Sequence, residues 1–94
     1  MSWDVIIVGS GAAGSVIARR LVETTQARVL LLEAGGPDVH EAIHDPARSH
    51  ELWHVEEDWD YSTVPQRGAG GRRLHLPRGR VLGGSTSTLS LIHI

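Results

Sequence analysis

Three glycines near the start of the chain constrain its fold more than any other feature. The segment Gly9-Ser10-Gly11-Ala12-Ala13-Gly14 has the form G-x-G-x-x-G. It follows an unbroken apolar run, Val5–Val8, and leads into a helical pattern over Ala12–Thr24. Because a strand precedes the glycines and an amphipathic helix begins within them, the pattern predicts a dinucleotide-binding βαβ unit.

The spacing gives each glycine a physical role. Gly9 allows a tight turn out of the strand, and Gly11 lets the backbone approach a pyrophosphate because no Cβ is in the way. Gly14 permits close packing of the helix on the strand. The N–H groups of the first helical turn, at Ala12 and Ala13, would then hold a diphosphate together with the positive end of the helix dipole.

A second apolar run, Val29–Leu32, predicts the second strand of this unit, and Glu33 follows it directly. Such runs are typical of parallel strands that are buried on both faces. Glu33 stands 19 residues after Gly14, where an acid accepts hydrogen bonds from the ribose hydroxyls of adenosine. Its carboxylate would repel a 2′-phosphate, which argues against NADP. The fold class is therefore α/β, beginning with the first βαβ unit of a Rossmann-like parallel sheet.

The length of the chain predicts that this domain is incomplete. A dinucleotide-binding fold needs several βα units to cover both faces of its sheet, whereas only two suitable strands can be read in 94 residues. A chain of this size also buries a smaller share of its surface than a full domain does. We therefore expect a fragment of a longer protein that is marginally stable on its own.

Charge and residue usage exclude several other classes of function. The net charge is −2, so no basic excess is present to bind a nucleic acid backbone. The chain has no cysteine, which excludes disulfides and thiolate metal sites and is compatible with a cytoplasmic location. No apolar run approaches the ~20 residues that span a bilayer, so we expect no transmembrane segment.

The rest of the chain is predicted to be mostly loop and hairpin. In residues 38–58 we expect a loop with one short helical stretch, because Pro46 breaks any helix there. Residues 59–66 and 72–76 predict two antiparallel strands joined by a glycine-rich turn. Residues 77–87 form a glycine- and hydroxyl-rich loop.

Several segments of the chain together resemble one enzyme family. They are 4–9 (DVIIVG), 31–36 (LLEAGG), 59–61 (WDY), 63–66 (TVPQ) and 77–87 (PRGRVLGGSTS). In these segments the chain resembles the glucose–methanol–choline (GMC) oxidoreductases, and the last segment is the most specific. The resemblance implies that residues 1–88 are the N-terminal part of an FAD-binding domain. It further implies an enzyme that oxidises a small-molecule alcohol, primary or secondary.

The resemblance also implies which residues face the FAD. The expected cofactor-binding residues are Gly9, Gly11, Ala12, Ala13, Gly14, Glu33, Val81, Gly83, Gly84 and Ser85. The first motif would face the pyrophosphate, Glu33 the adenosine ribose, and the last four residues the part of the cofactor nearer the flavin. Paired glycines let a backbone approach a flat ligand, and neighbouring hydroxyls can hydrogen-bond it. Arg78 and Arg80 could neutralise diphosphate charge, but arginines in loops are more often solvated, so we do not include them.

The mode of FAD binding and the chemistry are inferred from the same resemblance. Some family members attach FAD covalently through a histidine four residues after the second glycine of the later loop, and Thr88 occupies that position here. Threonine cannot form that bond, so we expect non-covalent FAD. The family's catalytic histidine lies near a distant C-terminus and has no match here, so no catalytic residue is expected and the 94 residues alone should be inactive. The electron acceptor, whether oxygen, a quinone or another compound, stays open.

Two alternatives keep the nucleotide-binding fold. One is an NAD-binding Rossmann protein, because the glycine motif alone does not separate NAD from FAD. The other is a non-catalytic nucleotide-binding remnant. A yellow, fluorescent protein-bound cofactor would exclude NAD.

A third alternative is a metal-dependent hydrolase. Residues 40–44 and 50–54 both fit H-E-x-x-H, in which histidines one helical turn apart could bind zinc. Asp45-Pro46 would end the first helix at its second ligand, and neither segment has a convincing third ligand. We therefore expect no metal-ligating site, and at most adventitious binding of divalent ions.

The last six residues, 89–94 (LSLIHI), are expected to be a non-native tail. After residue 88 the family has an asparagine and a longer helix, so the resemblance stops there. The codons CTG-TCT-CTT-ATA-CAC-ATC would encode these residues and resemble a transposon end that is used as an adapter in sequencing libraries. Such a scar would be excluded from fold reasoning. The alternative is a short apolar C-terminal strand.

Overall fold

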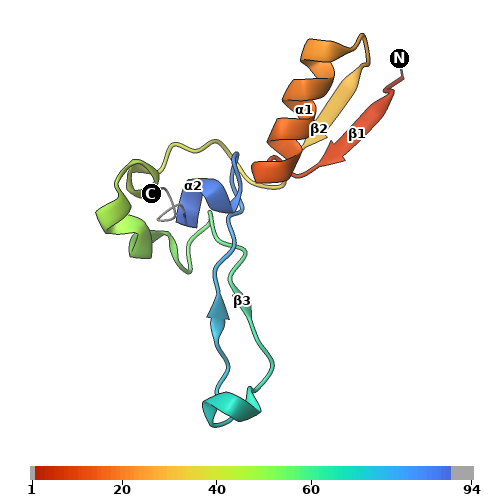
Figure 1. Cartoon of the computed structure of the whole chain (residues 1–94). Coiled ribbons are helices and arrows are strands. Elements are labelled where there is room, and N and C mark those ends of the chain that lie inside the picture. The colour runs from red at the N-terminus through yellow and green to blue at the C-terminus, as the bar shows by residue number, and fades with distance from the viewer. Residues whose placement is uncertain (1, 90–94) are drawn as a thin grey trace.

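The first part of the chain forms the predicted βαβ unit. The computed structural model describes residues 2–89, except the side chain of Leu89. Strand β1 (Val5–Val8) leads into helix α1 (Ala12–Thr24), and strand β2 (Val29–Leu32) returns beside β1 in parallel (Figure 1). The α/β class and the expected boundaries of these three elements are confirmed.

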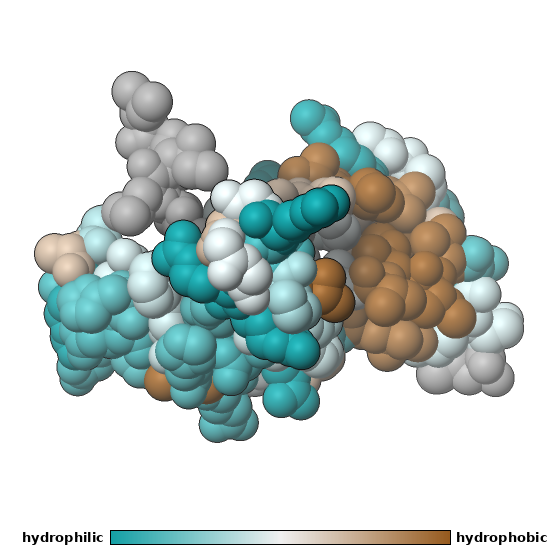
Figure 2. Space-filling view, turned by 90° about the horizontal axis from the view of Figure 1, so that it is seen from below, coloured by the Kyte–Doolittle hydropathy of each residue, from teal (hydrophilic) through white to brown (hydrophobic). Residues whose placement is uncertain are grey.

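In the residues that the structure describes, one face of these strands is uncovered, which agrees with the expectation that the domain is incomplete. Ile7 is buried beneath α1, but Ile6 and Val8, on the opposite face of β1, are 57% and 84% exposed. Leu32, which is paired with Val8, is also exposed. Side chains alternate between the faces of a strand, and α1 covers one face only. Figure 2 shows the resulting hydrophobic surface over the βαβ unit.

Two short 3-10 helices follow where the sequence predicts one helical stretch. Helix η1 (Glu41–His44) is separated from helix η2 (Pro46–Leu52) by Asp45. Pro46 begins η2, because the fixed φ of proline suits the first position of a helix. The Asp45 carboxylate caps η2 by accepting the N–H of Ala47 at 3.1 Å.

The next segment forms the predicted antiparallel hairpin. Strand β3 (Tyr61–Ser62) pairs with strand β4 (His75–Leu76), and both are shorter than the predicted strands. A bridge between Asp58 and Gly79 continues the pairing toward the base of the hairpin. The short helix η3 (Arg67–Ala69) turns the chain at the tip. In Figure 1 the hairpin is a long arm that leaves the body of the molecule.

The glycine- and hydroxyl-rich segment, predicted to be loop, ends in helix α2 (Ser85–Leu89). Ahead of α2 the chain returns to the end of β2, where the N–H of Leu82 donates to the carbonyl of Gly36 at 2.9 Å. Helix α2 packs against η2. Val81, just before α2, and Leu52, at the end of η2, are both buried.

Two expectations concern the ends and the helices of the chain. Of the predicted tail, 89–94, only Leu89 falls within the described residues, as the last residue of α2, and 90–94 lie outside them. Between residues 2 and 89 no helix combines the length and apolarity needed to cross a bilayer.

The uncovered face of the sheet leads to a prediction for the 94-residue chain on its own. Because Ile6 and Val8 are exposed, this chain should bind the hydrophobic dye ANS, aggregate, and unfold without a cooperative thermal transition. Changing both residues to threonine should lower ANS fluorescence. Val64→Thr is the control, because this valine is 70% exposed and lies on the hairpin arm, so its loss should leave the signal unchanged. A sharp, cooperative melt without ANS binding would contradict the prediction.

Candidate functional site

The glycine turn between β1 and α1 forms one side of the site. Gly9 has φ +98°, a left-handed conformation that favours glycine, and its N–H donates to the carbonyl of Leu32 at 2.7 Å. A Cβ at Gly14 would overlap the carbonyl oxygen of Gly9. A Cβ at Gly11, in contrast, would meet no atom of the described residues within 4 Å. The backbone at Gly11 therefore faces open space.

The N-terminus of α1 opens toward the same space. Gly11 is the N-cap of this helix, no side chain caps it, and no acidic residue lies in its first turn. The backbone N–H groups at a helix N-terminus carry partial positive charge and have no partner within the helix. This end of α1 can therefore receive an anionic group such as a phosphate.

Glu33 follows β2 and is held by the glycine turn. Its Oε2 accepts the N–H of Ser10 at 2.9 Å and the hydroxyl of Ser10 at 2.8 Å, and its Oε1 accepts the N–H of Gly35 at 2.9 Å. Burial by itself raises the pKa of Glu33, but these hydrogen bonds outweigh it and hold the pKa below its usual value of 4.5. Glu33 is therefore an ionised acceptor at neutral pH, with a lone pair still available on Oε1.

The loop before α2 lies directly against the glycine turn. Gly84 has φ +63°, and a Cβ there would stand 2.8 Å from the Cα of Gly11, so only glycine fits. The N–H of Gly83 donates to the hydroxyl of Ser10 at 3.3 Å. The hydroxyl of Ser85 accepts a backbone N–H from within the same loop at 3.0 Å. These contacts fix the later loop to the βαβ unit.

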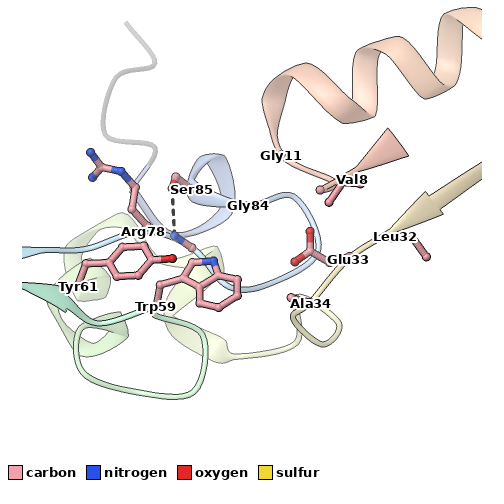
Figure 3. Close-up of a pocket in the computed structure, with 12 residues that line it drawn as sticks. Val8, Gly11, Leu32, Glu33, Ala34, Trp59, Tyr61, Arg78, Gly84 and Ser85 are labelled. Carbon is pink, nitrogen blue, oxygen red and sulfur yellow. Dashed lines mark hydrogen bonds between the residues drawn. The ribbon is translucent and has the colours of Figure 1, made fainter. Parts of the chain in front are cut away.

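A cavity of about 730 Å³ lies between the glycine turn, the end of β2, the base of the hairpin and the later loop. Figure 3 shows residues of all four segments around it. The expected cofactor-binding residues that line it are Gly9, Gly11, Glu33, Gly84 and Ser85. Half of the set inferred from the sequence is thus brought together around one space.

The other expected residues lie elsewhere. Ala12 and Gly83 line an adjoining cavity of about 400 Å³ on the α1 side of the loop. Ala13 is exposed on α1, and Gly14 packs this helix against β1. Val81 is completely buried, with an exposed fraction of 0%, and so lines neither of the two cavities.

The main cavity also contains residues that the sequence analysis did not select. They are Val8, Leu32, Ala34, Trp59, Tyr61, Arg78 and Gly79. The rings of Trp59 and Tyr61 stack in parallel with their centroids 6.0 Å apart, and Figure 3 shows both facing the cavity. The spacing of two residues between them, within the strand predicted over 59–66, was the sequence signal that could have identified them. Arg78, which is predicted to be a solvated loop residue, also lines the cavity.

The two H-E-x-x-H segments do not form the zinc site that their pattern suggested. His40 Nδ1 accepts the N–H of Ala42 at 3.1 Å and so caps η1. The Glu51 carboxylate binds Arg48 at 2.7 Å. His54 lies beyond the end of η2. Among residues 2–89, no group of three ligands comes from these two segments alone.

The hydrogen bonds of Glu33 predict how stability depends on pH. Because the pKa of Glu33 is lower in the folded state, ionised Glu33 stabilises the fold fully above about pH 4.5, and this contribution is lost as the pH falls through the folded pKa. Glu33→Gln should be less stable than the native protein at pH 7, and the difference should shrink below pH 4.5. Urea unfolding of the longest product of the gene that contains this sequence measures this difference across the pH range. The control is Glu56→Gln, at an exposed glutamate, and a constant difference for Glu33→Gln would contradict the assignment.

Comparison with known proteins relates this site to one family. Residues 7–39, which include α1, β2 and Glu33, match the NAD(P)-binding Rossmann-like domain. An uncharacterised GMC-type oxidoreductase of Mycobacterium bovis is 43% identical over 97% of this chain and 17% of its own length. The pyridoxine 4-oxidase of Microbacterium luteolum is 46% identical over the same shares. The oxygen-dependent choline dehydrogenase of Photobacterium profundum is 44% identical over 99% of this chain and 16% of its own length.

Comparison with solved structures points to the same family of oxidoreductases. The crystal structure of pyridoxine 4-oxidase from Mesorbium loti matches with a TM-score of 0.91 and 42% identity over 99% of this chain and 18% of that one. A formate oxidase from Aspergillus oryzae, studied for its FAD modification, matches with a TM-score of 0.75 and 34% identity over 92% of this chain and 16% of that one. The chain thus spans about 17% of the curated relatives that it matches. Because those relatives are 43% and 46% identical over 97% of the chain, it belongs to the glucose–methanol–choline (GMC) oxidoreductase family.

Proposed function

We propose that this chain is the FAD-binding part of an oxidoreductase that oxidises an alcohol by hydride transfer to the flavin. The observation that carries the proposal is the cavity between the glycine turn and the loop before α2, with Glu33 on its wall. Its volume of about 730 Å³ is in the range of small-molecule and cofactor sites. The activity is proposed for the whole protein, since the chain spans about 17% of its curated relatives.

The residues of the cavity suit the parts of a dinucleotide. The pyrophosphate would lie across Gly11, at the uncapped N-terminus of α1, where the N–H groups and the helix dipole favour negative charge. The ribose of the adenosine would donate to the free lone pair on Glu33 Oε1. Gly84 and Ser85 line the same cavity beside Gly11, where glycine permits a close approach and the hydroxyl can hydrogen-bond.

The proposed cofactor is FAD, bound without a covalent bond. A formate oxidase studied for its FAD modification is among the solved relatives. A βαβ unit is common to the binding sites of all dinucleotides, whereas this site has an additional wall formed by the loop before α2. Thr88, in α2, has no imidazole nitrogen with which to attach a flavin. The match to an NAD(P)-binding Rossmann-like domain describes a fold that both cofactors share, so NAD is the alternative outcome of the test.

The proposed substrate is a small primary or secondary alcohol. Pyridoxine and choline, which name two of the relatives, both carry an alcohol carbon, whereas formate, which names a third, does not. FAD, when bound, would supply a hydride acceptor for the alcohol carbon, and a general base would take the hydroxyl proton. We assign no residue between 2 and 89 to the base. The contribution of these residues is to bind and orient the cofactor.

The proposal is tested on the longest product of the gene that contains this sequence, which is found by sequencing the source DNA outward across codons 88–94. We expect the purified protein to be yellow. Under anaerobic conditions, choline, pyridoxine or a simple primary alcohol should bleach the flavin absorbance, because the two electrons of the hydride remain on the flavin.

Formate is the matched control, because it can donate hydride but has no alcohol carbon, and it should leave the spectrum unchanged. Bleaching by formate and by none of the alcohols would overturn the substrate class. A colourless protein that releases NAD on denaturation would overturn the cofactor.

A further inference from the structure

Four metal-binding side chains gather at the base of the hairpin, outside the residues that line the cofactor cavity. They are His54, Asp58, Asp60 and His75. His54 follows η2, the aspartates precede β3, and the second histidine belongs to β4, so separate segments of the chain meet here. Each residue offers one ligand atom, and the four atoms all lie within 4.8 Å of one another.

The geometry of the cluster is close to that of a metal site. His54 Nδ1 lies 2.5 Å from Asp60 Oδ1, and His75 Nε2 lies 2.9 Å from Asp58 Oδ2 and 3.4 Å from Asp60 Oδ1. The two imidazole rings stack with their centroids 4.0 Å apart. A tetrahedral zinc ion with bonds of about 2.0 Å holds its ligand atoms about 3.3 Å apart. Small outward shifts of the closer pairs would therefore admit an ion.

The backbone fixes the central ligand in place. The side chain of Asp58 is 2% exposed, and its carboxylate also accepts the N–H groups of His54 at 3.0 Å, Asp60 at 2.9 Å and Arg78 at 3.1 Å. Trp53 packs edge-on against the ring of His75. Contacts of this kind orient the ligands around metal ions in proteins. The fold thus holds Asp58 and His75 in place, and the more exposed His54 and Asp60 complete the cluster at the surface.

We propose that these four side chains bind one divalent transition-metal ion, for which zinc is the best fit. Two imidazole nitrogens and two carboxylate oxygens suit zinc, whereas calcium and magnesium prefer oxygen ligands alone. The ion replaces the protons that the imidazoles and carboxylates otherwise share, and the two carboxylates balance its charge. Four protein ligands leave no open position for water, so the role of the ion is structural.

The consequence of such an ion lies next to the cofactor cavity. It fastens the segment after η2 to β4 and to the residues just before β3, next in sequence to Trp59 and Tyr61 on the cavity wall. This site differs from the H-E-x-x-H pattern, because it shares only His54 with those two segments and uses no glutamate. Sequence spacing did not suggest it, since its ligands come from both sides of a hairpin.

The test is a titration of the metal-free, longest gene product with zinc chloride, followed by calorimetry. Cobalt(II) serves as a spectroscopic probe, because tetrahedral cobalt absorbs strongly in visible light. We expect one ion per chain and a tetrahedral cobalt spectrum. The double variant His54→Gln with His75→Gln should weaken zinc binding at least about a hundredfold and abolish the cobalt bands.

The matched control is His44→Gln with His50→Gln, which also removes two histidines but leaves the cluster intact, and it should bind zinc like the native protein. Circular dichroism checks the fold of each variant. If the double variant does not fold, His54→Gln alone replaces it, because that side chain is 61% exposed. Absence of one-to-one zinc binding, or equal losses in the test and control variants, would show that the cluster is held only by hydrogen bonds and would overturn the proposal.

Discussion

The site depends on one buried hydroxyl, that of Ser10, which is 1% exposed. This hydroxyl donates to the Glu33 carboxylate and accepts the N–H of Gly83, and the backbone N–H of Ser10 donates to the same carboxylate. A buried polar group is costly unless it is hydrogen-bonded, so these bonds hold the glycine turn, the end of β2 and the later loop in one arrangement. The cavity exists because these segments, distant in sequence, are joined there.

Asp58, a second buried polar side chain, organises the base of the hairpin on the other side of the cavity. Asp58 accepts backbone N–H groups from Asp60 and Arg78, on the two sides of the hairpin base, and from His54, two residues after the end of η2. Burial alone raises the pKa of Asp58, but these bonds and the one from His75 lower it below its usual value, so the group stays ionised. This network positions Trp59 and Tyr61. Glu33 and Asp58, two carboxylates that accept backbone N–H groups, thus organise the glycine turn and the base of the hairpin on the two sides of the cavity.

The βαβ unit could be predicted from the sequence because its signals are local. The glycine spacing and the apolar runs fixed β1, α1, β2 and the position of Glu33. Burial could not be predicted in the same way, since an all-apolar strand such as Val5–Val8 indicates cover on both faces but not which segment supplies it. The aromatic wall at Trp59 and the cluster around Asp58 depend on which residues face each other across a hairpin. The burial of Val81 could not be predicted either, because a loop motif does not indicate which side chains turn into the core.

The most direct test of this account is the affinity of the Gly11→Ala variant for FAD. A Cβ at Gly11 would meet no atom of residues 2–89 within 4 Å, so the fold should persist, yet it would enter the space proposed for the pyrophosphate. Gly68→Ala is the control, because its Cβ is equally unobstructed and lies at the tip of the hairpin. Fluorescence titration of the apoprotein should show binding at least about tenfold weaker for Gly11→Ala, or ~1.4 kcal/mol, and native affinity for Gly68→Ala. Native affinity in both variants would contradict the claim that FAD lies across the glycine turn.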